Sequence, residues 1–430
     1  MNKRYHLVFA IVLLSFFPLP AKNTFTAILQ NELMRNYNVL KNKDIPACYI
    51  GLRIEETTSH TLYSSFGALN TNEFNKGRRM YITMRVGDRN LDNLHFSGNL
   101  QNQTSIAIPD ENIEEAIKLA LWRGIQNAYS KALDDLKTTK TKMTTRPVEQ
   151  DKSPDFSIEK ASMYYEKPTK FNELGLVEKE MTLRIDSLSG ILSNNRDIFT
   201  NSISCQAVMT RKFFVDTEGA DIVQNNGYIR MYMGAAVMAE DGMVLPVYKS
   251  YFGRNAKDLP TFQQMKEDVL EMSQTLSALK ISPTIDSYTG PVMLSGEVSG
   301  VFFHEFLGHR IEGARMKSGY DSQTLKKKIG EEILPKGISV IYDPTLPKYR
   351  NVILSGNYKF DDEGIPGQRV EVIKDGMLKN FLMSRIPIEG FPKSNGHGRG
   401  NLTIGTETRQ SNMIVESSNP VSLEELKILF

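Results

Sequence analysis

Two of the six histidines in this chain flank a glutamate in the segment His304-Glu305-Phe306-Leu307-Gly308-His309. Neutral imidazole nitrogens are common zinc ligands, and a neighbouring carboxylate can accept a proton from a water that the metal activates. We therefore predict a metallohydrolase site in which His304 and His309 bind the metal and Glu305 is the general base. The alternative is a buried helix that carries one hydrogen-bonded histidine and one surface histidine.

The spacing of the two histidines is unusual for ligands of one ion. Residues i and i+5 lie about 140° apart around an ideal helix, whereas the i and i+4 spacing of the common zinc-protease motif leaves about 40°. A regular helix could not direct both His304 and His309 at one ion. Because Gly308 precedes the second histidine, we expect a helix end or a π-type widening there that turns His309 back towards His304.

Three further groups of potential ligands lie outside this segment. Cys48 and Cys205 could form one bridge or remain two buried thiols, and neither belongs to a CxxC metal pattern. The acidic triplet Asp361–Glu363 could be a second metal cluster, but glycine and proline follow it, so we expect a turn with exposed carboxylates. His397 lies in a glycine-rich loop. It could contact substrate or replace a ligand, although we expect it on the surface.

Length and charge limit the class of protein. The chain has 430 residues, of which 24% are charged and 40% hydrophobic, and its formal net charge is +2. These values are typical of a soluble globular protein with about two or three domains. A net charge so close to zero gives no support for nucleic-acid binding.

The N-terminus has the pattern of an export signal. Basic residues at positions 3 and 4 precede an apolar run over 7–17 and a Pro-Leu-Pro-Ala stretch. This order predicts a secretory signal peptide over residues 1–21, and the run is too short for a comfortable membrane span. We expect a periplasmic or secreted protein with no stable membrane anchor. An uncleaved anchor or a buried helix is the alternative.

Periodicity of the apolar residues gives a coarse map of the elements. Helices are predicted over 24–37, 111–136, 174–192 and 262–279. Strands are predicted over 47–54, 61–66, 79–86, 204–215, 228–239, 243–252, 291–294, 338–342, 352–355, 368–373 and 377–383. The strands between 204 and 252 are separated by hairpin turns and should form an antiparallel meander.

The predicted fold class is α+β, with two domains after the signal peptide. An N-terminal α/β domain spans 22–200, with a polar linker near 138–157, and a largely antiparallel β domain spans 201–430 and carries the histidine helix. The end of the chain, 422–430, has helical periodicity but no cap or polar tail. This favours a fragment of a longer protein, with the C-terminal domain incomplete; a natural terminus docked into the core is the alternative.

The segment 300–313, which contains both histidines, resembles the signature of the TldD/PmbA family of metalloproteases, also called modulators of DNA gyrase. Three downstream stretches agree with the family in the same order, and together they extend the resemblance over about residues 290–430: 361–368, 372–382 and 409–413.

The resemblance implies a zinc-dependent peptidase in which His304 and His309 bind zinc and Glu305 is the general base. It also implies a third protein ligand, a cysteine, that would lie beyond Phe430, so the sequence given is expected to be inactive by itself. The family contains paired subunits, one of which has lost the motif. A homodimer or a heterodimer with a related subunit is therefore expected, with this chain as the catalytic type.

Substrate contacts are expected from the segment that contains Arg409, Ser411 and Asn412, which could line the cleft as the resemblance suggests, and from His397. A strand edge and turn is the alternative for this segment. An extended peptide could bond to a sheet edge beside the zinc, so we predict unstructured peptides as substrates. The competing hypothesis is a non-catalytic scaffold or partner subunit. A nucleic-acid factor is disfavoured by the charge and by export.

Overall fold

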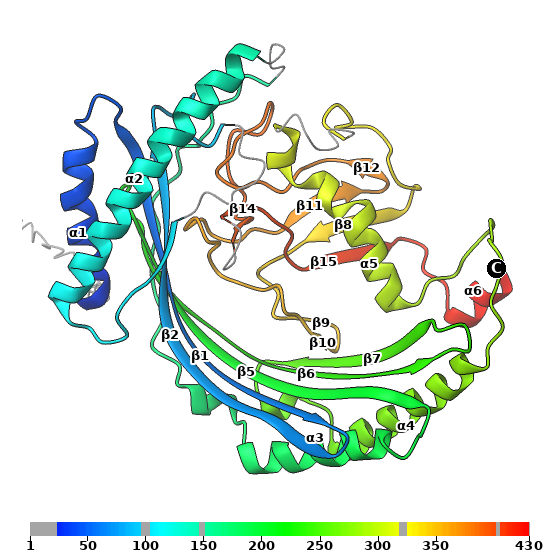
Figure 1. Cartoon of the computed structure of the whole chain (residues 1–430). Helices are drawn as coiled ribbons and strands as arrows, with labels where there is room; N and C mark the ends of the chain where they lie inside the picture. The colour runs from blue at the N-terminus through cyan, green and yellow to red at the C-terminus, as the bar shows by residue number, and fades with distance from the viewer. Residues whose placement is uncertain (1–23, 96–103, 146–150, 318–324, 401–404, 430) are drawn as a thin grey trace, which may run out of the picture.

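A computed structural model describes residues 24–95, 104–145, 151–317, 325–400 and 405–429. A long, strongly curved sheet organises the molecule: helices cover its convex face, and the C-terminal region lies on its concave side (Figure 1). The α+β fold class is confirmed. The predicted signal peptide lies outside the described residues. Among the helices that are described, none combines the length and the apolar character that crossing a bilayer requires.

The large sheet has seven strands, and β7 (Val244–Gly253) pairs with β6 beside the main path. All its pairings are antiparallel except that of β4 with β6, and β5, β6 and β7 form the predicted meander. The spatial order of the other strands is β3 (Thr104–Ala107), β2 (Ala68–Val86), β1 (Ala47–Ser65), β5 (Ile198–Asp216), β6 (Asp221–Met238) and β4 (Met163–Tyr165).

The hairpin of β1 and β2 consists of two 19-residue strands. Phe66 and Gly67 connect them with φ of 51° and 80°, the positive values that a type I′ turn requires. The sequence predicted a break between strands over 47–54 and 61–66, because polar residues intervene. The structure shows no break there, since residues 55–60 pair with β2 on one side and with β5 on the other.

Two groups of helices cover the convex face (Figure 1). Side chains that alternate along β1, including Ile50, Leu52 and Ile54, form one core with α1 and α2, as the two-residue period of a strand requires. A second core joins α3 and α4 to β5, β6 and β7. The helices of this part are α1 (Thr24–Leu40), α2 (Glu114–Thr145), α3 (Glu178–Leu192) and α4 (Phe262–Lys280), with short 3₁₀ turns at Phe171–Leu174 and Ala256–Asp258.

The domain limits differ from the prediction. Because β5, β6 and β7 are bonded to β1 in one sheet, that sheet runs across the boundary proposed at residue 200. The predicted polar linker is also wrong where it is described: residues 138–145 are the last turns of α2, and Asp151, Asp155 and Phe156 are buried. The Phe156 ring lies under the guanidinium groups of Arg85 and Arg385, and so packs between the sheet and the C-terminal region.

The C-terminal region contains a smaller antiparallel sheet, in the order β12 (Met377–Leu378), β11 (Val370–Lys374), β8 (Ile338–Tyr342) and β15 (Met413–Ser417). A turn with positive φ at Asp375 and Gly376 joins β11 to β12, in the gap between the strands predicted over 368–373 and 377–383. The strand predicted over 377–383 is limited to its first two residues, and 291–294 is not a strand. The remaining elements are β9 (Lys348–Tyr349), β10 (Val352–Ile353), β13 (Gly398–Arg399), β14 (Glu407–Thr408) and α6 (Leu423–Leu429), the last in the helical segment predicted at the end of the chain.

Candidate metal centre

The first histidine lies on α5 (Gly296–Phe306), and the second lies beyond the end of that helix. The Ser295 side chain caps the N-terminus by accepting a hydrogen bond from the Val298 N–H at 3.4 Å. The helix ends at Phe306, and Gly308–Ile311 then form a 3₁₀ turn. The change of direction expected at Gly308 is therefore a helix end.

This helix end brings the predicted group together. The imidazole rings of His304 and His309 lie 4.7 Å apart, centre to centre, at 76°. The Glu305 carboxylate lies 3.7 Å from the Nε2 atom of His304 and 3.9 Å from that of His309. The alternative of a buried helix is excluded, because no residue of α5 is buried.

The donor atoms of these three side chains suit a zinc ion. One ligand atom from each lies within 4.8 Å of the others. The two imidazole nitrogens are donors that zinc accepts, and the Glu305 carboxylate lies beside them. Within the described part of the chain, this is the one group of three His, Cys, Asp or Glu side chains close enough to hold a metal. The side chain of Glu305 is 65% exposed, so solvent can reach the group.

A buried carboxylate that the sequence analysis missed supports the second histidine. Glu312 is 1% exposed, and its Oε1 atom lies 3.2 Å from the Nδ1 atom of His309. Its other oxygen accepts a hydrogen bond from Arg315 Nε at 2.6 Å and lies 3.9 Å from Arg409 Nη1. When Nδ1–H donates to a carboxylate, Nε2 is left free to bind a metal. In the sequence, a glutamate three residues after His309 was the pattern that could have indicated this contact.

Close packing accounts for the glycine before His309. A Cβ atom at Gly308 would overlap the side-chain amide of Gln410, which lies directly against the turn. The Tyr342 hydroxyl donates a hydrogen bond to Gln410 Oε1 at 3.2 Å and fixes this amide. Leu307 and Ile311, on either side of His309, belong to the C-terminal core. The second histidine is thus held on a buried turn, while the first lies on an exposed helix.

The four candidate substrate residues occupy different surroundings. His397 is fully buried, which corrects the expectation of a surface histidine: its Nε2 atom lies 3.0 Å from Ser411 Oγ, and its Nδ1 atom 3.0 Å from Asn395 Oδ1. Burial lowers the pKa of His397 to about 4. Asn412 holds loops together, since its amide donates to the carbonyls of Asp343 and Leu346.

Arg409 is the member of this set that approaches the metal group. It forms an ion pair with Glu407 and lies beside Glu312, which supports His309. One carboxylate, that of Glu312, therefore lies between Arg409 and His309.

The acidic triplet Asp361–Glu363 is buried, contrary to the exposed carboxylates that we expected. Asp361 accepts hydrogen bonds from three backbone N–H groups, and burial raises its pKa well above the usual value. Burial would also raise the pKa of Asp362, but the charges of Arg399, Lys212 and Arg53 hold it far below its ordinary range. The turn was predicted correctly, and its burial was not.

The two cysteines are free. Cys205 is buried in the core under α3 and α4, and Cys48 is partly buried on β1. Burial raises the pKa of Cys48 to about 11 and that of Cys205 to about 12. Both are therefore protonated thiols at neutral pH.

Comparison with known proteins finds a known domain in the C-terminal region. Residues 287–427 match the model of the PmbA/TldA metallopeptidase C-terminal domain. A metalloprotease of Archaeoglobus fulgidus is 30% identical over 135 residues, which are 31% of this chain and 30% of the relative. A metalloprotease of Methanocaldococcus jannaschii is 27% identical over 256 residues, 58% of this chain and 53% of the relative. A zinc metalloprotease TldD homolog of Saccharolobus solfataricus is 32% identical over 127 residues, 27% of this chain and 26% of the relative. The matched regions thus span about half of these relatives, or less.

Solved structures agree over most of the chain. A protein of Thermotoga maritima described as a modulator of a DNA gyrase has a TM-score of 0.59 at 17% identity and covers 93% of this chain and 79% of its own. TldE from Thermococcus kodakarensis has a TM-score of 0.57 at 15% identity, with the same coverage. At such identities the likeness shows the fold. Together with the C-terminal domain matched over residues 287–427, it supports membership of the TldD/PmbA family.

Proposed function

We propose that this protein is a zinc-dependent peptidase that hydrolyses unstructured peptides. The observation that carries the proposal is the meeting of His304, Glu305 and His309 at the end of α5, with their donor atoms within 4.8 Å of one another. The names of the relatives support a metalloprotease, and one of them is named a zinc metalloprotease. The third protein ligand, a cysteine on the family resemblance, stays a prediction.

Each residue of the proposed metal centre has a separate role in the reaction. Zinc supplies a Lewis acid that polarises a peptide carbonyl and makes water more acidic. His304 and His309 would hold the ion, and the buried carboxylate of Glu312 keeps the His309 ring oriented. The exposed Glu305 carboxylate would accept the proton of the attacking water and pass it to the leaving amine.

The large sheet offers a place for an extended peptide. Among the described strands, β7 pairs only with β6, so its other edge presents unpaired backbone groups. The N-terminal end of α5 lies within electrostatic reach of this strand: the pKa of Lys249 on β7 is raised chiefly by its hydrogen bond to Asp268 and, to a smaller extent, by Glu297 of α5. Bonding through the backbone would favour unfolded segments over folded proteins.

Export and dimer formation are further parts of the proposal. The basic and apolar pattern of residues 1–21 supports a periplasmic or secreted protein, which sequencing of the mature N-terminus would test. The family resemblance supports a homodimer or a heterodimer with a related subunit. Light scattering of the purified protein, alone and with that subunit, tests this part.

The decisive experiment replaces Glu305 by glutamine. We expect peptide hydrolysis to fall by about 10²- to 10⁴-fold, because the general base is lost, while zinc content and folding remain. Glu297→Gln, on the same exposed helix, is the matched control. Unchanged hydrolysis in Glu305→Gln would refute this mechanism. Metal-free protein that folds normally and shows no hydrolysis would favour the scaffold hypothesis.

A further inference from the structure

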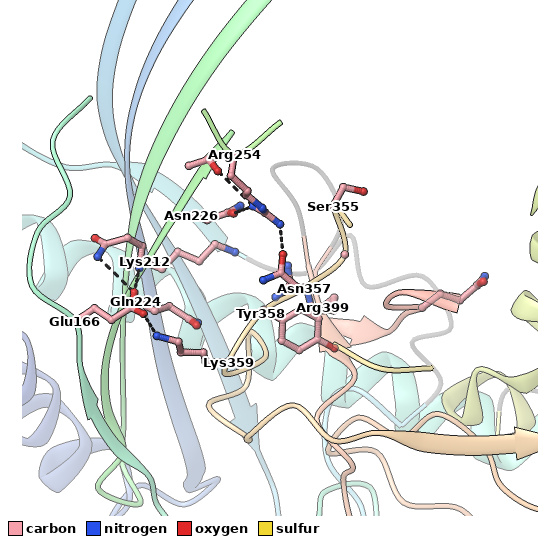
Figure 2. Close-up of a pocket in the computed structure, with 14 residues that line it drawn as sticks. Glu166, Lys212, Gln224, Asn226, Arg254, Ser355, Asn357, Tyr358, Lys359 and Arg399 are labelled. Carbon is pink, nitrogen blue, oxygen red and sulfur yellow. Dashed lines mark hydrogen bonds and ion pairs between the residues drawn. The ribbon is translucent and has the colours of Figure 1, made fainter. Parts of the chain in front are cut away.

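A second site with binding chemistry lies between the large sheet and the C-terminal region. It is a cavity of about 320 Å³, within the range of small-molecule pockets (Figure 2). One wall comes from β5, β6 and the end of β7, and the other from the loop after β10. The side chains that line it include those of Lys212, Asn226, Arg254, Asn357, Lys359 and Arg399.

The charges that line the cavity are unequal. Lys212, Arg254, Lys359 and Arg399 contribute four cationic side chains, whereas Glu166 is the one lining carboxylate. Glu166 forms an ion pair with Lys359. Lys212 and Arg399 both lie close to Asp362, a buried carboxylate behind the wall, and Lys212 also pairs with Glu55 at 3.2 Å.

Arg254 keeps its charge among neutral acceptors. Its Nη1 group donates to Asn226 Oδ1 at 2.8 Å and to the Gly227 carbonyl at 3.3 Å. Its Nη2 group donates to the Leu354 carbonyl at 2.9 Å and to Asn357 Oδ1. Among the described residues no carboxylate lies within ion-pair distance of this guanidinium, and burial lowers its pKa. An anion at this position would offset the cost of burying the charge.

A carboxylate could take the place of a side-chain amide here. Figure 2 shows the Asn226 and Asn357 side chains on either side of the Arg254 guanidinium. Hydrogen bonds between an arginine and a carboxylate are about twice as strong as neutral ones and are often bidentate. An incoming carboxylate that displaces one amide oxygen therefore replaces a hydrogen bond with one charged partner by an ion pair in which both partners are charged.

The cavity is connected to the metal centre through Gln410. This residue lines the cavity, and its side chain lies against Gly308, next to His309. Its Nε2 donor is buried without a hydrogen-bond partner in the described structure, although its Oε1 atom accepts from Tyr342. A ligand that extends from Arg254 towards the histidines would pass this unbonded donor, which suits a peptide carbonyl.

We propose that this cavity is a substrate subsite that binds a carboxylate of a peptide at Arg254, while the preceding backbone runs past Gln410 towards the metal centre. The proposal rests on the peptidase function and adds a preference to it. The carboxylate belongs either to the C-terminus of a short peptide or to an acidic side chain. In the first case the enzyme removes short C-terminal fragments, and in the second it cleaves beside acidic residues.

Binding to metal-free protein tests the subsite without hydrolysis and without carboxylate binding to zinc. Three N-acetylated tetra-alanine peptides serve as probes: one with a free C-terminal carboxylate, one amidated, and one amidated with a single glutamate. Isothermal titration calorimetry of each peptide compares the wild type with Arg254→Gln and Lys359→Gln. Arg230→Gln is the matched control, because Arg230 lies over the same Phe252 ring as Arg254 but does not line the cavity.

We expect the wild type and Arg230→Gln to bind at least one carboxylate peptide about tenfold more tightly than the neutral peptide. Arg254→Gln should remove this preference, and Lys359→Gln, whose side chain is exposed, should reduce it without affecting the fold. The peptide that binds more tightly identifies the source of the carboxylate. Equal binding of all three peptides by the wild type overturns the proposal, as does a preference that survives both cavity substitutions.

The subsite and the peptidase function fail in different ways. If the zinc-loaded protein cleaves peptides through Glu305 but binds neutral and anionic peptides equally, the function stands and the subsite is refuted. If the metal-free protein prefers carboxylates but the loaded protein cleaves no peptide, the subsite stands and the function is refuted.

Discussion

The metal group on α5 and the acidic triplet Asp361–Glu363 contain similar ligand types in opposite surroundings. In the metal group, Glu305 is exposed, and its carboxylate faces two imidazole rings. In the triplet, Asp362 is buried between cations, and Asp361 accepts three backbone hydrogen bonds. Asp362 thus holds the C-terminal region to the sheet, whereas the bonds of Asp361 stay within the C-terminal region. A candidate metal site is distinguished by donor atoms that other protein groups leave available, and not by the number of carboxylates.

The largest effect that this comparison predicts is the loss of stability in Asp362→Asn. The substitution leaves Arg53, Lys212 and Arg399 without their shared negative charge in a buried place, which costs about 3–5 kcal/mol. Urea unfolding monitored by circular dichroism measures it. Glu305→Gln is the control and should change stability by less than about 0.5 kcal/mol, because its side chain is exposed. Equal losses of stability in the two variants would show that Asp362 contributes no more to stability than Glu305 does.

The next effect concerns pH and depends on the buried His397. Burial lowers the pKa of His397 from 6.5 to about 4, so the folded protein binds fewer protons than the unfolded chain between these values. The stability contributed by neutral His397 is complete above about pH 6.5, and it falls as the pH decreases towards 4, by about 3 kcal/mol in total. Unfolding curves from pH 7.5 to 4.5 should therefore show a smaller slope in His397→Asn than in the wild type.

Glu312 lies where the two environments meet, because a buried carboxylate contacts a metal-group histidine. Glu312→Gln should weaken zinc binding about 10- to 100-fold, since the orientation of the His309 ring is lost. Competition with a zinc chelator measures the affinity without reference to hydrolysis. Glu407→Gln serves as control because Glu407 pairs with Arg409, which it shares with Glu312. Unchanged zinc affinity in Glu312→Gln would show that the contact is only structural.

The smallest predicted effect is at Gly308. In Gly308→Ala the new methyl group displaces the Gln410 amide, and the loss of its hydrogen bond with Tyr342 costs about 1 kcal/mol. The double variant Gly308→Ala/Gln410→Ala should lose less than the sum of the single variants, because the overlap is gone. Additive losses in thermal unfolding would mean that the glycine is needed for another reason.

Local sequence was sufficient for the features that depend on neighbouring residues. The change of direction before His309, expected as a helix end or a π-type widening, followed from the i and i+5 spacing and from Gly308. The hairpin at Asp375 and Gly376 followed from turn chemistry. Both involve forces that act within a few residues. The same holds for the long helices and for the meander, whose apolar periods are regular.

Features that depend on distant partners were not predicted. The burial of Asp362 requires Arg53 and Lys212, which lie on strands far away in the sequence. His397 is buried and its ring lies 3.0 Å from the Ser411 hydroxyl of a later segment, although its glycine-rich sequence is typical of a surface loop. Residues 55–60 are polar and nevertheless continue β1, because strands on both sides pair with them. Tertiary packing overrode local preference in all three cases.

Helix α5 has eleven residues, and none of them is buried. An isolated helix of that length is only marginally stable in water. An ion bound by both its last turn and the following buried turn would therefore stabilise the helical conformation. Part of the binding free energy would then order the backbone, and zinc would bind less tightly than to a rigid copy of the same donors. Hydrogen exchange would show this directly: the α5 amides should exchange faster than those of β8 without metal, and should slow when zinc is added.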